Sequence, residues 1–160
     1  MAKVLVVDDQ RSMRAAVCAM LRQEGHEAEE AQDANDARAR IASESFDLVL
    51  TDLRMGSTDG LQLLREVKES SSPTEVIVMT AYGTIESAVD AMRLGAHDYI
   101  QKPFSEQELL VKVQRAIEQR RLVGEVGFLA AEFRERYHFE NIIGRSQAIR
   151  DVLGRIVRIA

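Results

Sequence analysis

Residues 4–9 have the sequence Val-Leu-Val-Val-Asp-Asp, in which four apolar residues precede two carboxylates. A short apolar run rich in β-branched residues is typical of a parallel strand buried on both faces. Similar runs lie at 47–51 and 76–80. Weaker strand patterns lie at 98–100 and at 27–30. The segment 27–30 is polar enough for an edge strand. We therefore expect five strands.

Segments with helical periodicity separate these strands. The clearest apolar stripe consists of Ile85, Ala88, Val89 and Met92. The segments 59–62 and 105–108 are capping boxes, and Gly25 and Gly95 suit left-handed helix C-caps. The alternation of five strands with five helices predicts an α/β fold, a doubly wound five-stranded parallel sheet with helices on both faces.

Composition excludes several classes of protein. The 160 residues are 46% hydrophobic, which suits one ordinary domain with a further segment attached. The net charge is −5 and the acidic excess lies in residues 1–104, so we expect no direct contact with nucleic acid. Cys18 is the only cysteine, and the first apolar run is too short to span a membrane. We expect a cytoplasmic protein without membrane contact.

Polar residues follow four of the expected strands: Asp8 and Asp9, Asp52, Thr80, and Lys102. Ligands of doubly wound sheets bind beyond the carboxyl ends of the strands. Three carboxylates repel one another unless a cation lies among them, and oxygen ligands on loops suit Mg²⁺. An Asp beside Mg²⁺, with a lysine and a hydroxyl nearby, can act as the nucleophile that accepts a phosphoryl group. The Thr80 hydroxyl and the Ala81 amide are candidate donors to phosphate oxygens.

Each of these residues also has an ordinary structural explanation. An Asp after a strand is commonly a helix N-cap, a role we assign to Asp59. Thr80 alone suits a turn, and Lys102 alone suits a solvated surface. Four such placements at the ends of four strands favour a common site over four separate coincidences.

The motifs around these residues resemble the receiver domain of two-component response regulators. In chain order they are Val6-Val7-Asp8-Asp9, Leu50-Thr51-Asp52-Leu53-Arg54-Met55, Met79-Thr80-Ala81 and Asp98-Tyr99-Ile100-Gln101-Lys102-Pro103-Phe104. The resemblance covers about residues 1–120. It implies a flavodoxin-like strand order of 2-1-3-4-5.

The resemblance also implies a Mg²⁺ site. Asp52 accepts a phosphoryl group from a sensor histidine kinase, and Asp9 and Asp52 bind the metal directly. Asp8 acts mostly through water, and Arg54 supplies its backbone carbonyl. The domain is then a regulatory switch and not an enzyme.

A switch pair is implied by the same resemblance. Lys102 contacts the phosphoryl group, and the Lys102-Pro103 peptide is expected to be cis. Thr80 moves toward the phosphoryl group and Tyr99 turns inward into the vacated space. The surface that changes is expected within residues 83–120.

One position departs from the family pattern. Gly56 stands where the family usually has proline, four residues after the phospho-acceptor, whereas Gly60 is where the family has its glycine. The greater backbone freedom of glycine predicts faster motion of this loop without loss of chemistry.

The last helix is expected to continue past the receiver, over 105–137. Its apolar stripe comprises Leu110, Val113, Ile117, Leu122, Val126, Leu129 and Phe133. A long amphipathic helix favours pairing with a second copy as a coiled coil, although Gly124 and Gly127 weaken the helix or mark a hinge. The alternative is a single helix that packs back on its own domain.

Residues 138–160 resemble the opening of the AAA+ ATPase in sigma-54-dependent transcription activators. The sequence lacks the G-x-x-x-x-G-K loop that holds ATP, so this domain is incomplete here. The resemblance implies that phosphorylation rearranges a homodimer and thereby controls the ATPase, with sigma-54 RNA polymerase and DNA as partners of the full-length protein.

Three other functions fit the sequence less well. A stand-alone phosphorelay carrier would pass on phosphate without gating an output. A Mg²⁺-dependent phosphatase needs a second carboxylate two residues after the nucleophile, where this chain has Arg54. A flavin or dinucleotide carrier needs a glycine-rich turn where this chain has Asp8 and Asp9.

Overall fold

A computed structural model describes residues 1–70, 72–81 and 83–137. The expected ATPase segment, 138–160, therefore lies outside the described residues. Contacts divide the chain into two compact units, Met1–Ile117 and Glu118–Ala160. The helices are α1 (Arg11–Gln23), α2 (Ala34–Ser43), α3 (Gly60–Glu69), α4 (Ile85–Arg93) and α5 (Glu106–Tyr137).

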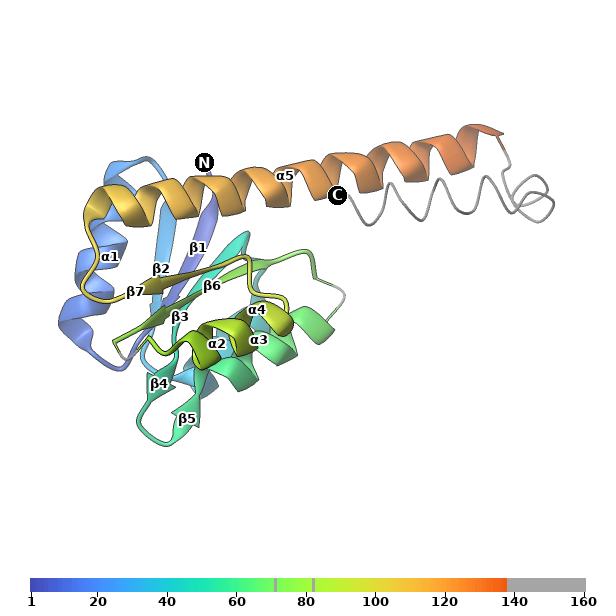
Figure 1. Ribbon diagram of the computed structural model, residues 1–160. Coiled ribbons are helices and arrows are strands. Elements are labelled where there is room, and N and C mark those ends of the chain that lie inside the picture. Colours follow the sequence, from blue (N-terminus) through green and yellow to red (C-terminus); the bar gives the residue numbers. More distant parts are fainter. Residues whose placement is uncertain (71, 82, 138–160) are drawn as a thin grey trace. The chain divides into compact units, whose positions relative to one another are not determined.

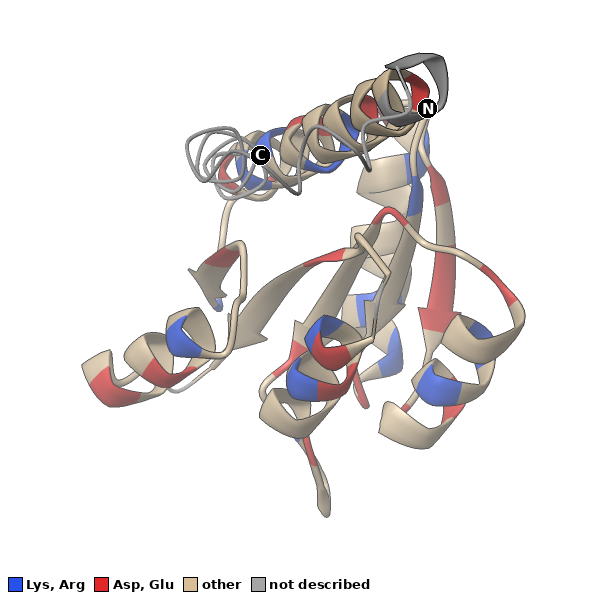
Figure 2. Cartoon of the chain, turned by 90° about the vertical axis from the view of Figure 1, so that its right-hand side faces the viewer, with Lys and Arg blue, Asp and Glu red and all other residues tan. Residues whose placement is uncertain are grey.

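A parallel sheet forms the centre of the first unit (Figure 1). Its strands, in spatial order, are β2 (Glu27–Ala31), β1 (Lys3–Val7), β3 (Leu48–Asp52), β6 (Glu75–Thr80) and β7 (Asp98–Gln101). This order equals the expected 2-1-3-4-5 once a small hairpin is set aside. The α/β fold and the edge position of β2 are confirmed, and Figure 2 shows the acidic residues on that edge strand.

Successive strand residues face two separate cores. Leu5, Val49 and Val78 pack with α2, α3 and α4 on one face of the sheet. Val6 and Leu50 pack with α1 and the first turns of α5 on the other. Because all five side chains are fully buried, both faces of the central strands are covered, as their unbroken apolar sequences predict.

A two-stranded hairpin, β4 (Arg54–Met55) and β5 (Thr58–Asp59), was not predicted. Its turn begins at Gly56, whose φ of +60° lies in the left-handed region that proline cannot adopt. The Thr58 hydroxyl also donates to the Met55 carbonyl at 2.7 Å. The segment after the third strand of the sheet is therefore paired, and its expected faster motion stays a prediction.

The helix ends follow the sequence signals. Asp59 accepts a hydrogen bond from the Leu61 amide at 2.9 Å, and Ser105 accepts one from the Glu108 amide at 3.1 Å. Gly25 has a φ of +86° and caps α1 in the left-handed conformation. Helix α5 continues through both of its glycines to Tyr137. Within the residues that the structure describes, no helix is long and apolar enough to cross a membrane.

The amino end of the sheet carries a charged group of residues, called here the Lys3 cluster. Lys3 Nζ lies 3.4 Å from Glu27 Oε1 and 3.0 Å from Glu29 Oε1, and it also pairs with Glu44. The same atom lies 5.3 Å from the centre of the Phe46 ring, within cation–π range. These contacts link strands β1 and β2 to the end of α2.

Candidate functional site

The carboxyl ends of the strands bring the predicted site residues to one edge of the sheet. Asp52 is the last residue of β3 and Thr80 the last of β6, while Asp8 and Lys102 directly follow β1 and β7. Parallel pairing aligns these ends, because Val7 is in register with Thr51, Asp52 with Met79, and Thr80 with Gln101. The expectation of a common edge is therefore confirmed.

Backbone hydrogen bonds continue past the strand ends at this edge. They run from Asp8 N to Ala31 O (3.2 Å), from Leu53 N to Met79 O (2.8 Å) and from Lys102 N to Thr80 O (2.7 Å). The peptide before Pro103 is cis, as expected. The backbone that carries the site side chains is therefore hydrogen-bonded to a neighbouring strand at the end of β1, β3 and β7.

Asp8 is the most enclosed of the carboxylates and is fully buried. Its Oδ1 accepts the Gln10 amide at 2.9 Å, and its Oδ2 lies 2.5 Å from Lys102 Nζ. Its backbone carbonyl accepts Arg14 Nη1 at 2.7 Å. Bonds to the carboxylate and to the carbonyl together fix the loop that carries both aspartates.

Asp52 shares the same lysine. Its Oδ2 lies 3.4 Å from Lys102 Nζ, and only 7% of the residue is exposed. Burial raises the pKa of Asp52 above its usual value, and the nearby charge of Asp8 raises it further. Lys102 and a backbone hydrogen bond from Arg54 act in the opposite direction without cancelling the rise in this pKa. The ionised carboxylate is thus held where one lysine does not fully compensate it.

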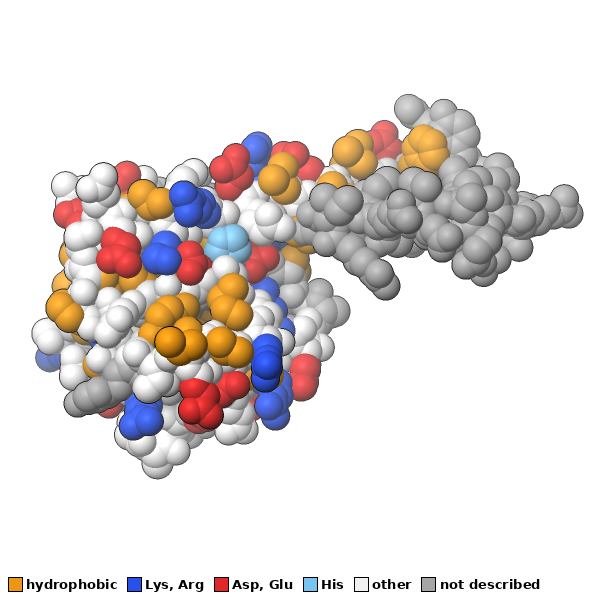
Figure 3. Space-filling model, in the orientation of Figure 1, with side chains coloured by type: hydrophobic (Ala, Val, Ile, Leu, Met, Phe, Trp, Pro, Cys, Tyr) orange, Lys and Arg blue, Asp and Glu red, His pale blue; other side chains and the backbone are white. Residues whose placement is uncertain are grey.

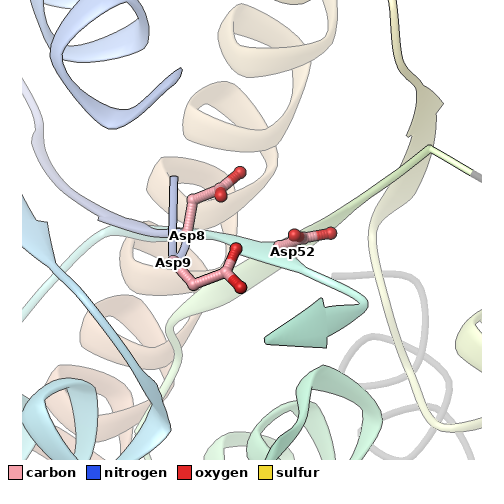
Figure 4. Close-up of side chains that lie close together, drawn as sticks. All are labelled: Asp8, Asp9 and Asp52. Carbon is pink, nitrogen blue, oxygen red and sulfur yellow. The ribbon is translucent and has the colours of Figure 1, made fainter. Parts of the chain in front are cut away.

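The three aspartates form a group that could hold a cation (Figure 4). Each of Asp8, Asp9 and Asp52 offers a carboxylate oxygen, and these atoms all lie within 4.8 Å of one another. Asp9 is exposed, so the group is open to solvent on one side. An all-oxygen donor set with one exposed face fits Mg²⁺, which keeps several waters and takes one or two carboxylates. The residues present therefore fit the metal that the sequence predicts.

The remaining predicted residues lie on the β6 and β7 side of this group. Thr80 is 2% exposed, and Ala81 follows it at the surface. Tyr99 is half-buried and is in register with Val78, two residues before Thr80 on β6. Because the side-chain period of a strand is two, Thr80 and Tyr99 belong to the face of the sheet that α4 covers.

Two residues support the site from outside it. Arg14 was not predicted from the sequence, and Gly60 was singled out only through the family resemblance. Arg14 carries the contact to the Asp8 carbonyl, and side chains of a first helical turn point back toward the helix N-terminus, a signal that could have found it. A Cβ on Gly60 would lie 2.0 Å from the Asp52 carbonyl oxygen. The start of α3 can approach the phospho-acceptor candidate this closely only because residue 60 has no side chain.

Comparison with known proteins decides the family. The family model described as the response regulator receiver domain matches residues 4–114. This chain belongs to that family. The receiver resemblance of the four motifs is thereby confirmed, and the family is a regulatory one.

Similar proteins include transcriptional regulators. The regulatory protein AtoC of Escherichia coli is 34% identical over 158 residues, which cover 99% of this chain and 34% of AtoC. The C4-dicarboxylate transport transcriptional regulatory protein DctD of Pseudomonas aeruginosa is 35% identical over 161 residues, covering 98% of this chain and 35% of DctD. This receiver-containing chain thus spans about a third of the length of these curated relatives.

Solved structures agree with the receiver fold. NtrX from Brucella abortus, crystallised in complex with ADP, is 40% identical with a TM-score of 0.75, covering 80% of this chain and 30% of that one. The beryllofluoride-activated NtrC4 receiver domain dimer is 33% identical with a TM-score of 0.71, covering 75% of this chain and 99% of that one.

Proposed function

We propose that this receiver domain accepts a phosphoryl group on Asp52 from a sensor histidine kinase in a Mg²⁺-dependent reaction. The observation that carries the proposal is the environment of the Asp52 carboxylate. It is nearly buried, lies 3.4 Å from Lys102 Nζ and belongs to a group of three carboxylates that fits a divalent cation.

The chemistry is a displacement at phosphorus. An Asp52 oxygen attacks the phosphorus atom of phosphohistidine, the phosphorus–nitrogen bond breaks, and its electron pair stays on the imidazole nitrogen. Lys102 balances negative charge on the transferred oxygens, from a position between Asp8 and Asp52. The Thr80 hydroxyl and the Ala81 amide donate to the remaining oxygens.

Asp9 and Asp52 would hold the metal directly, Asp8 would act through water, and the Arg54 carbonyl would complete the protein ligands. When bound, Mg²⁺ neutralises charge on the phosphoryl oxygens. The raised pKa of Asp52 supports this assignment, because the ionised carboxylate then gains from a cation beyond Lys102.

Phosphorylation is read out through Thr80 and Tyr99. The added charge of roughly −1.5 to −2 draws the Thr80 hydroxyl toward the phosphoryl group, and Tyr99 turns inward. Both residues belong to the α4 face of the sheet, which supports residues 83–120 as the surface that changes.

Two apolar features support a homodimer. Ile85, Val89 and Met92 expose 87%, 41% and 49% of their surface along α4, and Figure 3 shows hydrophobic side chains gathered there. In the second unit, Leu122, Leu129 and Phe133 of α5 are also exposed. With half-buried Val126 they recur every three or four residues, the spacing of a coiled-coil seam. The dimer of the NtrC4 receiver gives a precedent in a similar domain.

In this proposal the receiver covers 1–120, the dimerisation linker 105–137 and the start of an AAA+ domain 138–160. The dimer arrangement controls a sigma-54-activating ATPase in the cytoplasm, with RNA polymerase and DNA as partners of the complete protein. The similarity of nearly the whole chain to one third of AtoC and DctD supports this organisation.

Intact mass tests the acceptor. The chain is incubated with a small phosphodonor and Mg²⁺, beside an Asp52→Asn variant and a sample treated with a chelator. One added phosphoryl group is expected in the first sample and in neither control. No added mass, together with no stable beryllofluoride complex, would contradict the proposal.

The oligomeric state tests the switch. Light scattering after size-exclusion chromatography is expected to show a change of mass or of dimer affinity on beryllofluoride addition. A Leu129→Lys variant should weaken the dimer while leaving phosphorylation intact. A monomer in both forms would instead favour the stand-alone phosphorelay carrier.

A further inference from the structure

The Tyr99 hydroxyl occupies the space that a side chain at residue 83 would need. A Cβ on Gly83 would lie 2.0 Å from Tyr99 Oη, 3.3 Å from Tyr99 Cζ and 3.2 Å from Gln101 Cδ. The first contact is far shorter than any van der Waals separation, whereas the other two need only a small adjustment. The hydroxyl oxygen is therefore the atom that a side chain at this position displaces.

Gly83 differs from the glycines that the backbone requires. Gly25, Gly56 and Gly95 have positive φ values, so glycine at those positions provides a backbone conformation that other residues rarely adopt. Gly83 does not lie in that region, and its backbone is open to alanine. The requirement for glycine at residue 83 thus comes from the space taken by Tyr99.

The location connects this space to the proposed switch. Gly83 follows Thr80 by three residues and immediately precedes Thr84, the N-cap of α4. Thr84 Oγ1 accepts the Ser87 amide at 3.1 Å and so fixes the start of the helix next to Gly83. A side chain resting on Gly83 therefore contacts the segment that joins Thr80 to α4.

We propose that Gly83 is a positioning residue that forms the seat of the Tyr99 hydroxyl. Its missing side chain keeps one of the two positions of Tyr99 accessible, and so sets the balance between them. This inference rests on the proposed function in taking Thr80 and Tyr99 as the switch pair. It adds a third residue on which the coupling between Asp52 and the α4 surface depends.

The test is a double-mutant cycle of Gly83→Ala and Tyr99→Phe. Tyrosine labelled with ¹³C at Cζ reports on each of Tyr82, Tyr99 and Tyr137, and Tyr99→Phe identifies the signal that belongs to residue 99. Gly83→Ala is expected to shift the Tyr99 signal and to reduce the seated population at least tenfold, about 1.4 kcal/mol. In the Tyr99→Phe background the same substitution should leave unfolding nearly unchanged, because the clashing oxygen is gone.

A matched control is Gly127→Ala, at a helical glycine where an added Cβ would meet no neighbouring side chain within 4 Å. It should leave the Tyr99 signal in place. An unmoved Tyr99 signal in Gly83→Ala, or an equal loss of stability with and without the hydroxyl, would overturn the inference. Equal losses would indicate simple loop strain.

A phosphorylation experiment distinguishes a failure of this inference from a failure of the proposed function. Gly83→Ala is expected to take up one phosphoryl group on Asp52 as the unsubstituted chain does, while its Tyr99 signal and its oligomeric state lose their response to that group. If the unsubstituted chain takes up none, the proposed function fails, yet the cycle still measures the seat. If both chains respond equally, the seat has no part in the switch.

Discussion

Lys3 and Lys102 lie at opposite ends of one sheet, and each contacts several carboxylates. In the Lys3 cluster the lysine side chain is 23% exposed, and that of Glu27 is 52% exposed. At the other end the Lys102 side chain is 10% exposed and Asp8 is fully buried. The pKa of Glu29 is lowered, first by its hydrogen bond to Lys3, whereas the pKa of Asp52 is raised, first by burial.

The difference shows that burial, and not the choice of residues, separates the two groups. Near water, a lysine stabilises the charge of its partners at little desolvation cost. In the enclosed group the desolvation cost exceeds the stabilisation that one lysine supplies. A further positive charge would therefore stabilise these carboxylates. The first arrangement supports the fold, and the second is suited to bind a cation and a phosphoryl group.

The largest effect is expected from Lys102→Met. Removing the cation leaves Asp8 and Asp52 without their shared partner, and the free energy of unfolding should fall by about 3 kcal/mol at pH 7. Millimolar Mg²⁺ should restore a large part of that loss. Urea unfolding with and without the metal measures both quantities, and a loss that ignores Mg²⁺ would contradict the cation site.

A smaller gain is expected from Asp52→Asn. Because the folded-state pKa of Asp52 is raised, its stabilising contribution is present below the usual pKa of 3.8 and is lost as pH rises through the folded value. The ionised group therefore costs stability at neutral pH, and the variant should be more stable by about 1 kcal/mol at pH 7. The gain should vanish below about pH 4. A gain independent of pH would point to packing instead of charge.

Lys3→Met is the matched control for Lys102→Met and should have a weaker effect. The Lys3 pairs are exposed to solvent, so salt screens them. Thermal unfolding in low and high salt should show a small loss that disappears at about 1 M NaCl. Equal losses for the two lysine variants at high salt would break the distinction between the two ends of the sheet.

The smallest effect is expected from Glu29→Gln, with a pH dependence opposite to that of Asp52→Asn. The lowered pKa of Glu29 means that its contribution is present above the usual value of 4.5 and is lost as pH falls through the folded value. The variant should be slightly less stable at pH 7 and equal to the unsubstituted chain in acid. Parallel pH series of unfolding midpoints compare the two variants directly.

The sequence was sufficient for the sheet and for the location of the site. Uninterrupted apolar runs such as 4–7 identify strands buried on both faces, and the residues after them must then meet at one edge. The hairpin after Asp52 was missed, because strands of two residues carry no periodicity. The left-handed backbone at Gly56, where the hairpin turns, was not predicted either.

Contacts between distant residues escaped the sequence for a different reason. The seat of Tyr99 on Gly83 depends on the distance between a loop and a neighbouring strand, which no local pattern encodes. The same holds for the approach of Gly60 to the Asp52 carbonyl. Arg14 is an intermediate case, since helix geometry directs its side chain to the right loop without naming the carbonyl that it binds.

The backbone bonds beyond the strand ends have a consequence for how such a site evolves. Asp8, Lys102 and Leu53, the residue directly after Asp52, each donate a backbone amide hydrogen bond to the neighbouring strand, whatever their side chains are. A substitution of Asp8 or Lys102 changes the reactivity of this edge, while the backbone amide keeps its hydrogen bond. The same scaffold can therefore lose, regain or retune its chemistry by single replacements, and fold and function are free to vary at different rates.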